Sequence, residues 1–345
     1  MKSAMAFCAT AIVASSFQPA LGGQAPLVDA FSFEKVMVIP GVPWGPYSDH
    51  LAVDASRGRL FATPQAAHEV AVLDTRTSKV ISIIHDIGNP HGVFYSDRFD
   101  RIFITDGAAG AIKVFDGTRL TLETSIPAAG VDGLAYDPST KLLYAIYGGD
   151  DAGMKQAYLA IIDTATSRKI GDIEVQATSM DGPVVDSVHH RLYVEMSDRN
   201  AVAVIDLTSR RVIATWPIEH SRHNMATALD MQHHLLYVGC RDGDMRGSIA
   251  VLDLSSGKEV KRLAIGGWVD SMDYDVRRQR IYLSSGIGYL EAYQVLPGGV
   301  FRELQPAETA VMGKTSLYSP QLDREFVSVP HLGDTPAKIL VFRPR

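Results

Sequence analysis

The sequence predicts an all-β fold, a seven-bladed β-propeller of four-stranded antiparallel blades, on the strength of three observations. One short unit recurs seven times between about residue 49 and the C-terminus, at steps of 41 to 49 residues. Each unit reads as a series of apolar strands separated by turns, and repeats of this length with strand signals are typical of propeller blades. No segment after residue 25 has the period of a helix, so the fold should be nearly all β.

The first strand of each unit ends on an Asp or a Ser. The seven positions are Asp54, Ser96, Asp137, Asp186, Asp230, Asp275 and Ser319. A turn and a second strand follow, as in Arg59-Leu60-Phe61 of the first unit. Every unit carries this second strand, with Phe or Tyr as its third residue, so the register of the ring can be followed along the chain.

The third and fourth strands complete each unit. The third strand closes on Asp74, Asp116, Asp163, Asp206 and Asp253 in the first five units, and on Gln294 and Arg343 in the last two. Units six and seven are therefore degenerate at this position. The fourth strand follows a turn rich in Thr and Ser, and residues 79–84 and 211–216 show the β-branched enrichment of such a strand.

The seventh unit has no fourth strand of its own, because the sequence ends at Arg345 just after the third. Residues 34–39 precede the first full unit and match the fourth-strand pattern. We therefore expect a strand at about 33–39 to pair into the last blade and close the ring. Such closure leaves only short, protected sheet edges.

The first 22 residues have the features of a cleaved signal peptide. Lys2 supplies a positive start, residues 4–17 are apolar or small, and Ala20-Leu21-Gly22 offers small residues for cleavage. The apolar run is shorter than the roughly 20 residues that span a bilayer. We expect a periplasmic or secreted protein of bacterial type with no transmembrane anchor, and a single propeller domain over 23–345. Cleavage would remove Cys8 and leave Cys240 as the single cysteine of the mature chain, so we expect no internal disulfide.

The charge gives little support for nucleic acid as a partner. The formal net charge is −6, and the basic residues that gather in the turns of one rim lack the interleaved aromatic residues that stack on bases. We interpret these turns as solvated hairpins. The pairs His189-His190 and His233-His234 occupy the same turn in two units, which favours inheritance through the repeat over a metal motif.

The opposite rim carries more promising chemistry. Five residues before each Asp or Ser that ends the first strand, the chain approaches the central channel. Those seven ring positions are Asp49, His91, Asp132, Asp181, Met225, Asp270 and Lys314. Four carboxylates and an imidazole should converge on one opening, and nearby loops add His50, His223, Trp44 and Trp268.

Carboxylates and imidazoles at a concave mouth are the ligands of a divalent cation such as calcium or zinc, or the members of an acid/base pair. Positions across the channel are too far apart to share one ion, so adjacent ones should do so: His91 with Asp49 or Asp132, or Asp132 with Asp181. The metal candidates are His91, Asp132 and Asp181, and the candidate catalytic residues are His91 and His223. The candidate ligand-binding residues are Asp49, His50, His91, Asp132, Asp181, His223, Trp268, Asp270 and Trp44.

A structural role competes with this interpretation. An Asp before a Gly, as in Asp132-Gly133 and Asp181-Gly182, often bonds turn amides and fixes the loop that enters a strand. His91 and Lys314 break the repeat, which favours function over scaffolding at those two positions. Trp44 and Trp268 could line a ligand or seal the loops.

Residues 137–145, Asp-Pro-Ser-Thr-Lys-Leu-Leu-Tyr-Ala, and the following segment 159–170 resemble the repeat of the YncE-like, or YVTN-type, seven-bladed propeller family. The similarity covers residues 33–344, and Tyr193-Val194 and Tyr237-Val238 retain part of the tetrapeptide that names the family. The resemblance implies an exported bacterial propeller, and it implies no particular reaction.

Other propeller classes fit less well. The chain lacks the Gly-His and Trp-Asp pairing of WD40 repeats. It also lacks the repeated Thr-Gly-Lys-x-x-Trp ending of pyrroloquinoline-quinone dehydrogenases, and no phosphate-cradling loop for NAD or another nucleotide occurs. We expect none of these cofactors.

Two functions remain. The first is a binding module that captures a small ligand, a metal or a protein partner at the mouth. The alternative is a metal-assisted enzyme of the lactonase or lyase type, in which His91 or His223 moves protons. The sequence favours binding, because no Ser-His-Asp elbow, HExxH or spaced Cys ligand set appears.

Overall fold

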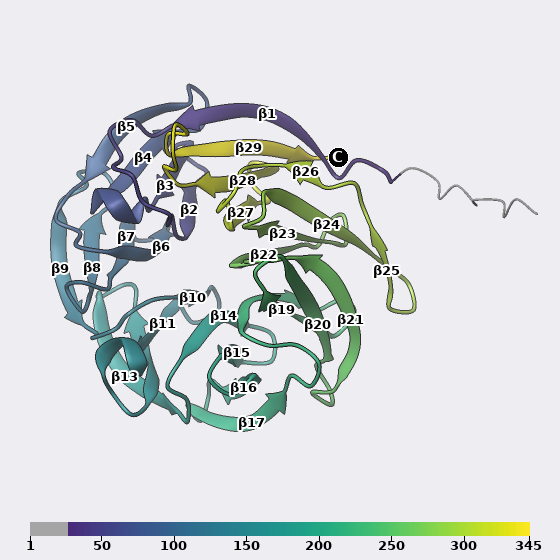
Figure 1. The fold of residues 1–345 in the computed structure, drawn as a ribbon. Coiled ribbons are helices and arrows are strands. Elements are labelled where there is room, and N and C mark those ends of the chain that lie inside the picture. Colours follow the sequence, from purple (N-terminus) through teal and green to yellow (C-terminus); the bar gives the residue numbers. More distant parts are fainter. Residues whose placement is uncertain (1–26) are drawn as a thin grey trace, which may run out of the picture.

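Seven β-sheets form a ring around a central channel in the computed structural model, which describes residues 27–345 (Figure 1). Six sheets have four strands, and the sixth blade has a fifth. Within each blade the strands follow one another in antiparallel order from the channel outward, which confirms the predicted fold class. The predicted signal peptide, residues 1–22, lies outside the described residues.

The first four blades follow the chain in order. Their strands are β2 (Leu51–Asp54), β3 (Arg59–Ala62), β4 (Val70–Asp74), β5 (Lys79–Ile84); β6 (Pro90–Ser96), β7 (Arg101–Asp106), β8 (Ala111–Asp116), β9 (Leu122–Pro127); β10 (Leu134–Asp137), β11 (Leu142–Gly148), β12 (Ala157–Asp163), β13 (Arg168–Val175); β14 (Met180–Asp186), β15 (Arg191–Met196), β16 (Ala201–Asp206) and β17 (Arg211–Pro217). The predicted strand ends at the Asp or Ser positions agree with these bounds.

The last three blades complete the ring. They contain β18 (Asn224–Asp230), β19 (Leu235–Gly243), β20 (Arg246–Asp253), β21 (Glu259–Gly266); β22 (Ser271–Asp275), β23 (Arg280–Ser285), β24 (Tyr289–Leu296), β25 (Val300–Glu303), β26 (Ala307–Glu308); β27 (Thr315–Ser319), β28 (Arg324–Val329), β29 (Lys338–Pro344) and β1 (Phe31–Val38). In the degenerate sixth blade, β24 pairs with both β25 and β26.

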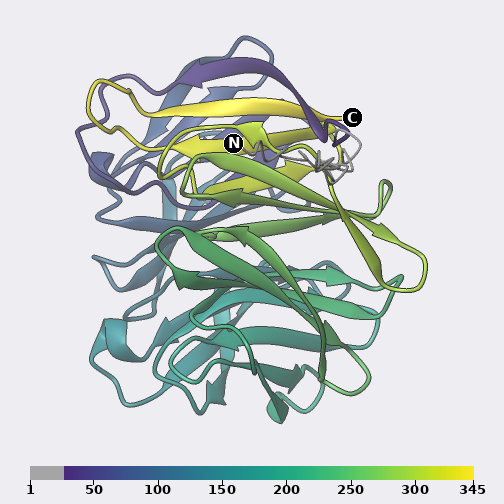
Figure 2. The same cartoon turned by 45° about the vertical axis from the view of Figure 1, so that its right-hand side comes forward.

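Strand β1 closes the ring by pairing antiparallel with β29, from Phe31 opposite Pro344 to Val38 opposite Lys338. Figure 2 shows this N-terminal strand lying along the outer edge of the C-terminal blade. The predicted closing strand is thus confirmed, and it begins two residues earlier than expected. An ion pair between Arg343 Nε and Glu34 Oε1, 2.9 Å apart, adds a side-chain link between the two ends of the chain.

The core repeats with the blades. In each blade, the third residue of the second strand is aromatic. Its side chain is at most 2% exposed, because it packs between neighbouring sheets. These residues are Phe61, Phe103, Tyr144, Tyr193, Tyr237, Tyr282 and Phe326. Each of them belongs to a different one of seven buried apolar clusters.

Two short 3-10 helices, which the sequence did not predict, interrupt the loops between second and third strands. They are η1 (Gln65–Ala67) and η2 (Asp150–Ala152). The first of them brings Gln65 to the rim of the channel. No helix within residues 27–345 is long and apolar enough to cross a bilayer.

Candidate functional site at the channel mouth

All seven ring positions line one cavity of about 240 Å³, which we call the channel mouth. They come from seven different blades, since each residue stands at or just before the start of an innermost strand. Tyr47, Ser48, His50, Gln65 and Arg241 complete the lining. The repeat register therefore predicted correctly which side chains meet at this opening.

A second cavity, the inner cavity, lies deeper along the channel and has a volume of about 210 Å³. It exists because the residue after each ring position is small in six of seven blades. These residues are Gly92, Gly133, Gly182, Ala226, Ser271 and Thr315, and the exception is His50. The inner cavity shares His50 and Asp270 with the channel mouth, so the two spaces adjoin.

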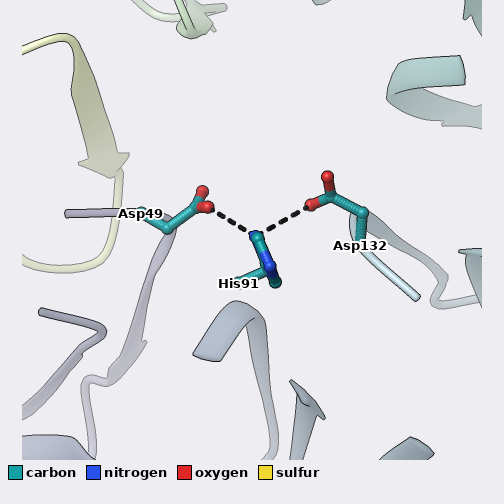
Figure 3. A group of neighbouring side chains, drawn as sticks. All are labelled: Asp49, His91 and Asp132. Atoms are coloured by element: carbon teal, nitrogen blue, oxygen red, sulfur yellow. Dashed lines mark hydrogen bonds and ion pairs between the residues drawn. The ribbon is translucent and has the colours of Figure 1, made fainter. Parts of the chain in front are cut away.

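Three ligand-type side chains from blades one, two and three gather at one side of the mouth (Figure 3). His91 Nδ1 lies 3.0 Å from Asp49 Oδ2 and 3.7 Å from Asp132 Oδ1. One ligand atom from each of the three residues lies within 4.8 Å of the others. We call Asp49, His91 and Asp132 the metal cluster.

Two amides hold the metal cluster in place. Gln65 Nε2 donates to Asp49 Oδ2 at 2.9 Å and lies 3.1 Å from His91 Nδ1. The side-chain amide of Asn89 lies 2.8 Å from His91 Nε2, so both ring nitrogens of His91 have neighbours. Gly107 packs against the same edge of the ring, where a Cβ atom would lie only 2.9 Å from Nε2. Such contacts fix the orientation of a metal-ligating histidine.

The three groups of the metal cluster perturb one another strongly. Burial alone would lower the pKa of His91, but the hydrogen bond to Asp49 and the charge of Asp132 outweigh it and raise the pKa to about 9. Burial and the charge of Asp49 raise the pKa of Asp132 to about 6. In Asp49 the effect of burial is overcome by His50, His91 and Lys314, and its pKa lies below the usual range. Without a metal, a proton on His91 offsets one of the two carboxylate charges.

The other side of the mouth is already neutralised by protein groups. Asp270 contacts both Arg241 and Lys314, and Thr315 Oγ1 donates to it at 3.3 Å. A carboxylate with two cationic partners has little left to offer a metal ion. Asp270, a predicted ligand-binding residue, thus lines the mouth as the centre of an ion-pair network.

The remaining predicted residues divide between several places. Asp181 lines the mouth but stands outside the metal cluster, and its Oδ1 accepts the Gly182 amide at 2.8 Å, as expected for a turn aspartate. His50 Nε2 lies 3.6 Å from Asp49 Oδ1.

His223 and Trp268 line a third cavity of about 370 Å³, the side cavity, which shares Met225 and Arg241 with the mouth. His91 is absent from its lining, so the two candidate catalytic histidines open into different cavities. Trp44 is 65% exposed and lines none of these three cavities.

Sequence reasoning missed several residues that shape the site. Gln65 and Asn89 belong to loops outside the repeat, and Arg241 extends from the irregular end of β19. Glu195 could have been recognised from the repeat, because it is a charged residue at a position where the other blades have uncharged ones. The position is two residues after the aromatic residue of the second strand. The other six blades have Thr63, Thr105, Ile146, Gly239, Ser284 and Ser328 at that position.

Several solved propellers resemble this chain in fold. A chain of the Kuenenia stuttgartiensis hydrazine synthase structure superposes with a TM-score of 0.74 at 14% identity, covering 88% of this chain and 98% of that one. A chain of the mitotic checkpoint complex gives 0.73 at 16% identity, with 96% and 99% covered. The WD40 repeats of RRP9 give 0.73 at 13% identity, with 93% and 99% covered.

Identities this low show the propeller fold alone. No protein-family model matches the chain, and no curated protein matches it in sequence. The seven-bladed propeller is therefore established, while membership of the YVTN-type family stays a prediction.

Proposed function

We propose that the protein is an exported binding module that holds a divalent cation of the zinc class at the channel mouth and captures a small ligand there. One observation carries the proposal: ligand atoms of Asp49, His91 and Asp132, from three different blades, lie within 4.8 Å of one another. A single nitrogen and two carboxylate oxygens suit zinc better than calcium, because imidazole is a ligand of transition metals.

The spacing of the three groups supports this assignment. Ligands bound tetrahedrally at zinc–ligand distances of about 2.0–2.1 Å lie about 3.3 Å from one another. The observed separations from His91 Nδ1, 3.0 and 3.7 Å, bracket that value. Three protein ligands leave a coordination position open toward the mouth, which a ligand entering the cavity would fill.

The geometry favours binding over turnover. His91 Nδ1 faces the two carboxylates with which it would hold the metal, and Nε2 lies 2.8 Å from the Asn89 side-chain amide, so neither ring nitrogen remains for a substrate proton. His223 lines the side cavity and is absent from the lining of the channel mouth.

The test is elemental analysis by mass spectrometry of the mature protein, purified from the periplasm without chelator. We expect close to one zinc per chain, lost in His91→Ala and in Asp132→Ala. His220→Ala is the matched control, because this loop histidine has a side chain 68% exposed and lies outside the metal cluster. The proposal would be overturned if the purified wild-type protein held only background metal and also bound no zinc when zinc was added in a calorimetric titration.

A panel of lactone and lyase substrates separates the two functional readings. Binding predicts zinc in the wild-type protein with no turnover of any substrate in the panel. Turnover that disappears in His91→Ala, while the melting temperature stays within a few degrees, would replace binding by the metal-assisted enzyme.

A further inference from the structure

We propose that the side cavity is a second binding site, which takes a small organic ammonium ion whose body is apolar. The cavity volume of about 370 Å³ lies within the size range of small-molecule sites, roughly 300–1,000 Å³. The side cavity shares no residue with the metal cluster, so this inference goes beyond the zinc proposal and does not rest on it.

Two loops supply the groups that would recognise such an ion. The β19–β20 hairpin carries Asp242 and Asp244, and the loop that joins β21 to β22 carries Trp268. Gly267 lets the two loops approach each other closely, since a Cβ atom added there would lie 2.8 Å from the carbonyl carbon of Asp244 and 2.9 Å from the amide nitrogen of Arg246. A carboxylate and an indole from different loops therefore meet in one cavity.

Trp268 gives the cavity an aromatic wall. It stands two residues before a ring position, where the backbone is left-handed in four blades, at Gly130, His223, Trp268 and Met312. Glycine suits such a backbone, whereas an indole there is strained. Gly286 makes room for the indole, because a Cβ atom added to it would lie 2.7 Å from Trp268 Cβ. A strained residue in a cavity wall is typical of a site that clamps a ligand.

The charges around the cavity favour a cation over an anion. Asp242 is already paired, since its Oδ2 accepts a hydrogen bond from Arg262 Nη2 at 2.6 Å. Arg241 is likewise paired with Asp270. Asp244 is exposed, and its carboxylate makes no hydrogen bond or ion pair with any group in residues 27–345. The cavity thus offers one uncompensated negative charge to a ligand.

The combination of an indole and a free carboxylate suits an ammonium ion in particular. Among aromatic side chains, the indole of tryptophan attracts a cation most strongly over its face. Met225 lines the same cavity and adds an apolar, adaptable contact for the body of the ligand. Trp268 and Met225 would therefore hold the body, while Asp244 pairs with the charge.

A purely structural role for Trp268 is the competing explanation. The Arg241 guanidinium lies 5.5 Å from the centroid of the indole ring, so one cation of the protein itself already contacts it. This explanation leaves Asp244 without a role. The two explanations differ in the effect of ligand charge, because only a binding site that uses Asp244 distinguishes a cation from a neutral molecule of similar shape.

The experiment is calorimetric titration of the chelator-treated mature chain at pH 7.5 with three probes of similar size: 2-phenylethylammonium, the neutral 2-phenylethanol and the anion phenylacetate. We expect one 2-phenylethylammonium per chain, bound about tenfold more tightly than either of the other probes. Asp244→Asn should remove this preference for the cation. Trp268→Ala should weaken binding of the ammonium ion about tenfold.

Each variant has a matched control. Asp334 is an exposed aspartate in the corresponding loop of the seventh blade, and Trp44 is a 65% exposed tryptophan; both lie outside the three cavities. Asp334→Asn and Trp44→Ala should bind the ammonium ion like the wild type. His91→Ala should also bind it while losing zinc, and Asp244→Asn should keep the zinc content of the wild type, so the two proposals fail separately.

The proposal would be overturned if the wild type bound no 2-phenylethylammonium, if it bound the three probes equally, or if Asp244→Asn kept the preference for the cation. Asp244→Asn changes an exposed side chain and should fold. It therefore decides the question even if Trp268→Ala fails to fold.

Discussion

The two faces of this propeller use the same residue type in opposite ways. At the turn rim, where the first strands end, aspartates such as Asp54 and Asp275 accept hydrogen bonds from their own turns and from arginine side chains. Burial would raise the pKa of each, but these contacts lower it. At the channel mouth, burial raises the pKa of Asp132 and Asp181 with few compensating partners. Asp49 and Asp270 of the mouth are paired like the carboxylates of the turn rim, so Asp132 and Asp181 are the mouth carboxylates with the fewest partners.

Several basic residues of the turn rim are paired with its aspartates. Arg57, Arg59 and Arg278 of the turn rim all pair with aspartates of that rim. The turn histidines do the same, since His189 and His233 each lie 2.7 Å from the aspartate three residues earlier. These five basic side chains are therefore paired within the turn rim itself and serve the scaffold.

The largest expected difference between the faces is in stability. Asp275→Asn should lower the free energy of unfolding by about 2–3 kcal/mol, because it removes the anion that pairs with the partly buried Arg278 and accepts Tyr282 Oη. Asp132→Asn at the mouth should change it by less than about 1 kcal/mol, because it also relieves repulsion with Asp49.

Urea denaturation of the metal-free chain measures both variants. Similar losses of stability in the two would contradict the contrast between paired and unpaired carboxylates. Zinc binding should show the reverse order, with Asp275→Asn unchanged and Asp132→Asn strongly weakened.

The pH dependence of stability gives the next largest effect. His91 has a folded-state pKa raised to about 9, above the ordinary value of 6.5. Its stabilisation is therefore fully present below pH 6.5 and is lost as the pH rises to 9, on the order of 1–3 kcal/mol. Asp275, with a lowered pKa, behaves oppositely and loses its contribution as the pH falls.

Chemical denaturation of the metal-free protein at pH 6.5 and pH 9 tests this effect. The wild type should lose stability over that range, and His91→Gln should lose much less. A variant whose profile parallels the wild type would show that the charge on His91 is not stabilised by its neighbours.

The smallest predicted effect is a loss of zinc affinity in a variant that keeps all three proposed zinc ligands. In Gly107→Ala, the added Cβ would meet His91 Nε2 at 2.9 Å and displace the ring from Asn89. Zinc affinity should fall about tenfold, as for other losses of the groups that orient a ligating histidine. Calorimetry measures the affinity, and Gly243→Ala is the control, because nothing lies within 4 Å of its added Cβ and its φ is not positive. Both glycine variants should fold, and equal zinc affinities would contradict the role of Asn89.

The sequence was sufficient for the fold and for the seven ring positions of the mouth. The recurring Asp or Ser fixed the strand ends, and counting back five residues placed all seven ring positions in one cavity. Neighbouring blades share an ion more readily than opposite ones, so the grouping of His91 with Asp49 and Asp132 could also be anticipated.

The groups that hold the site could not be predicted in this way. Gln65 reaches the mouth through the 3-10 helix η1, which among the described residues has a counterpart only in the third blade, and Arg241 reaches Asp270 from the preceding blade. Such contacts depend on loop conformation, which leaves no periodic trace in the sequence. Glu195 did leave one, a charge at a position where other blades have small or apolar residues.

The most direct test of the central claim is anomalous diffraction at the zinc absorption edge from crystals of the protein grown with zinc and without chelator. The account predicts one strong anomalous peak within bonding distance of His91 Nδ1 and of carboxylate oxygens of Asp49 and Asp132. No peak at the channel mouth, or zinc bound instead by the turn histidines His189 and His233, would contradict it.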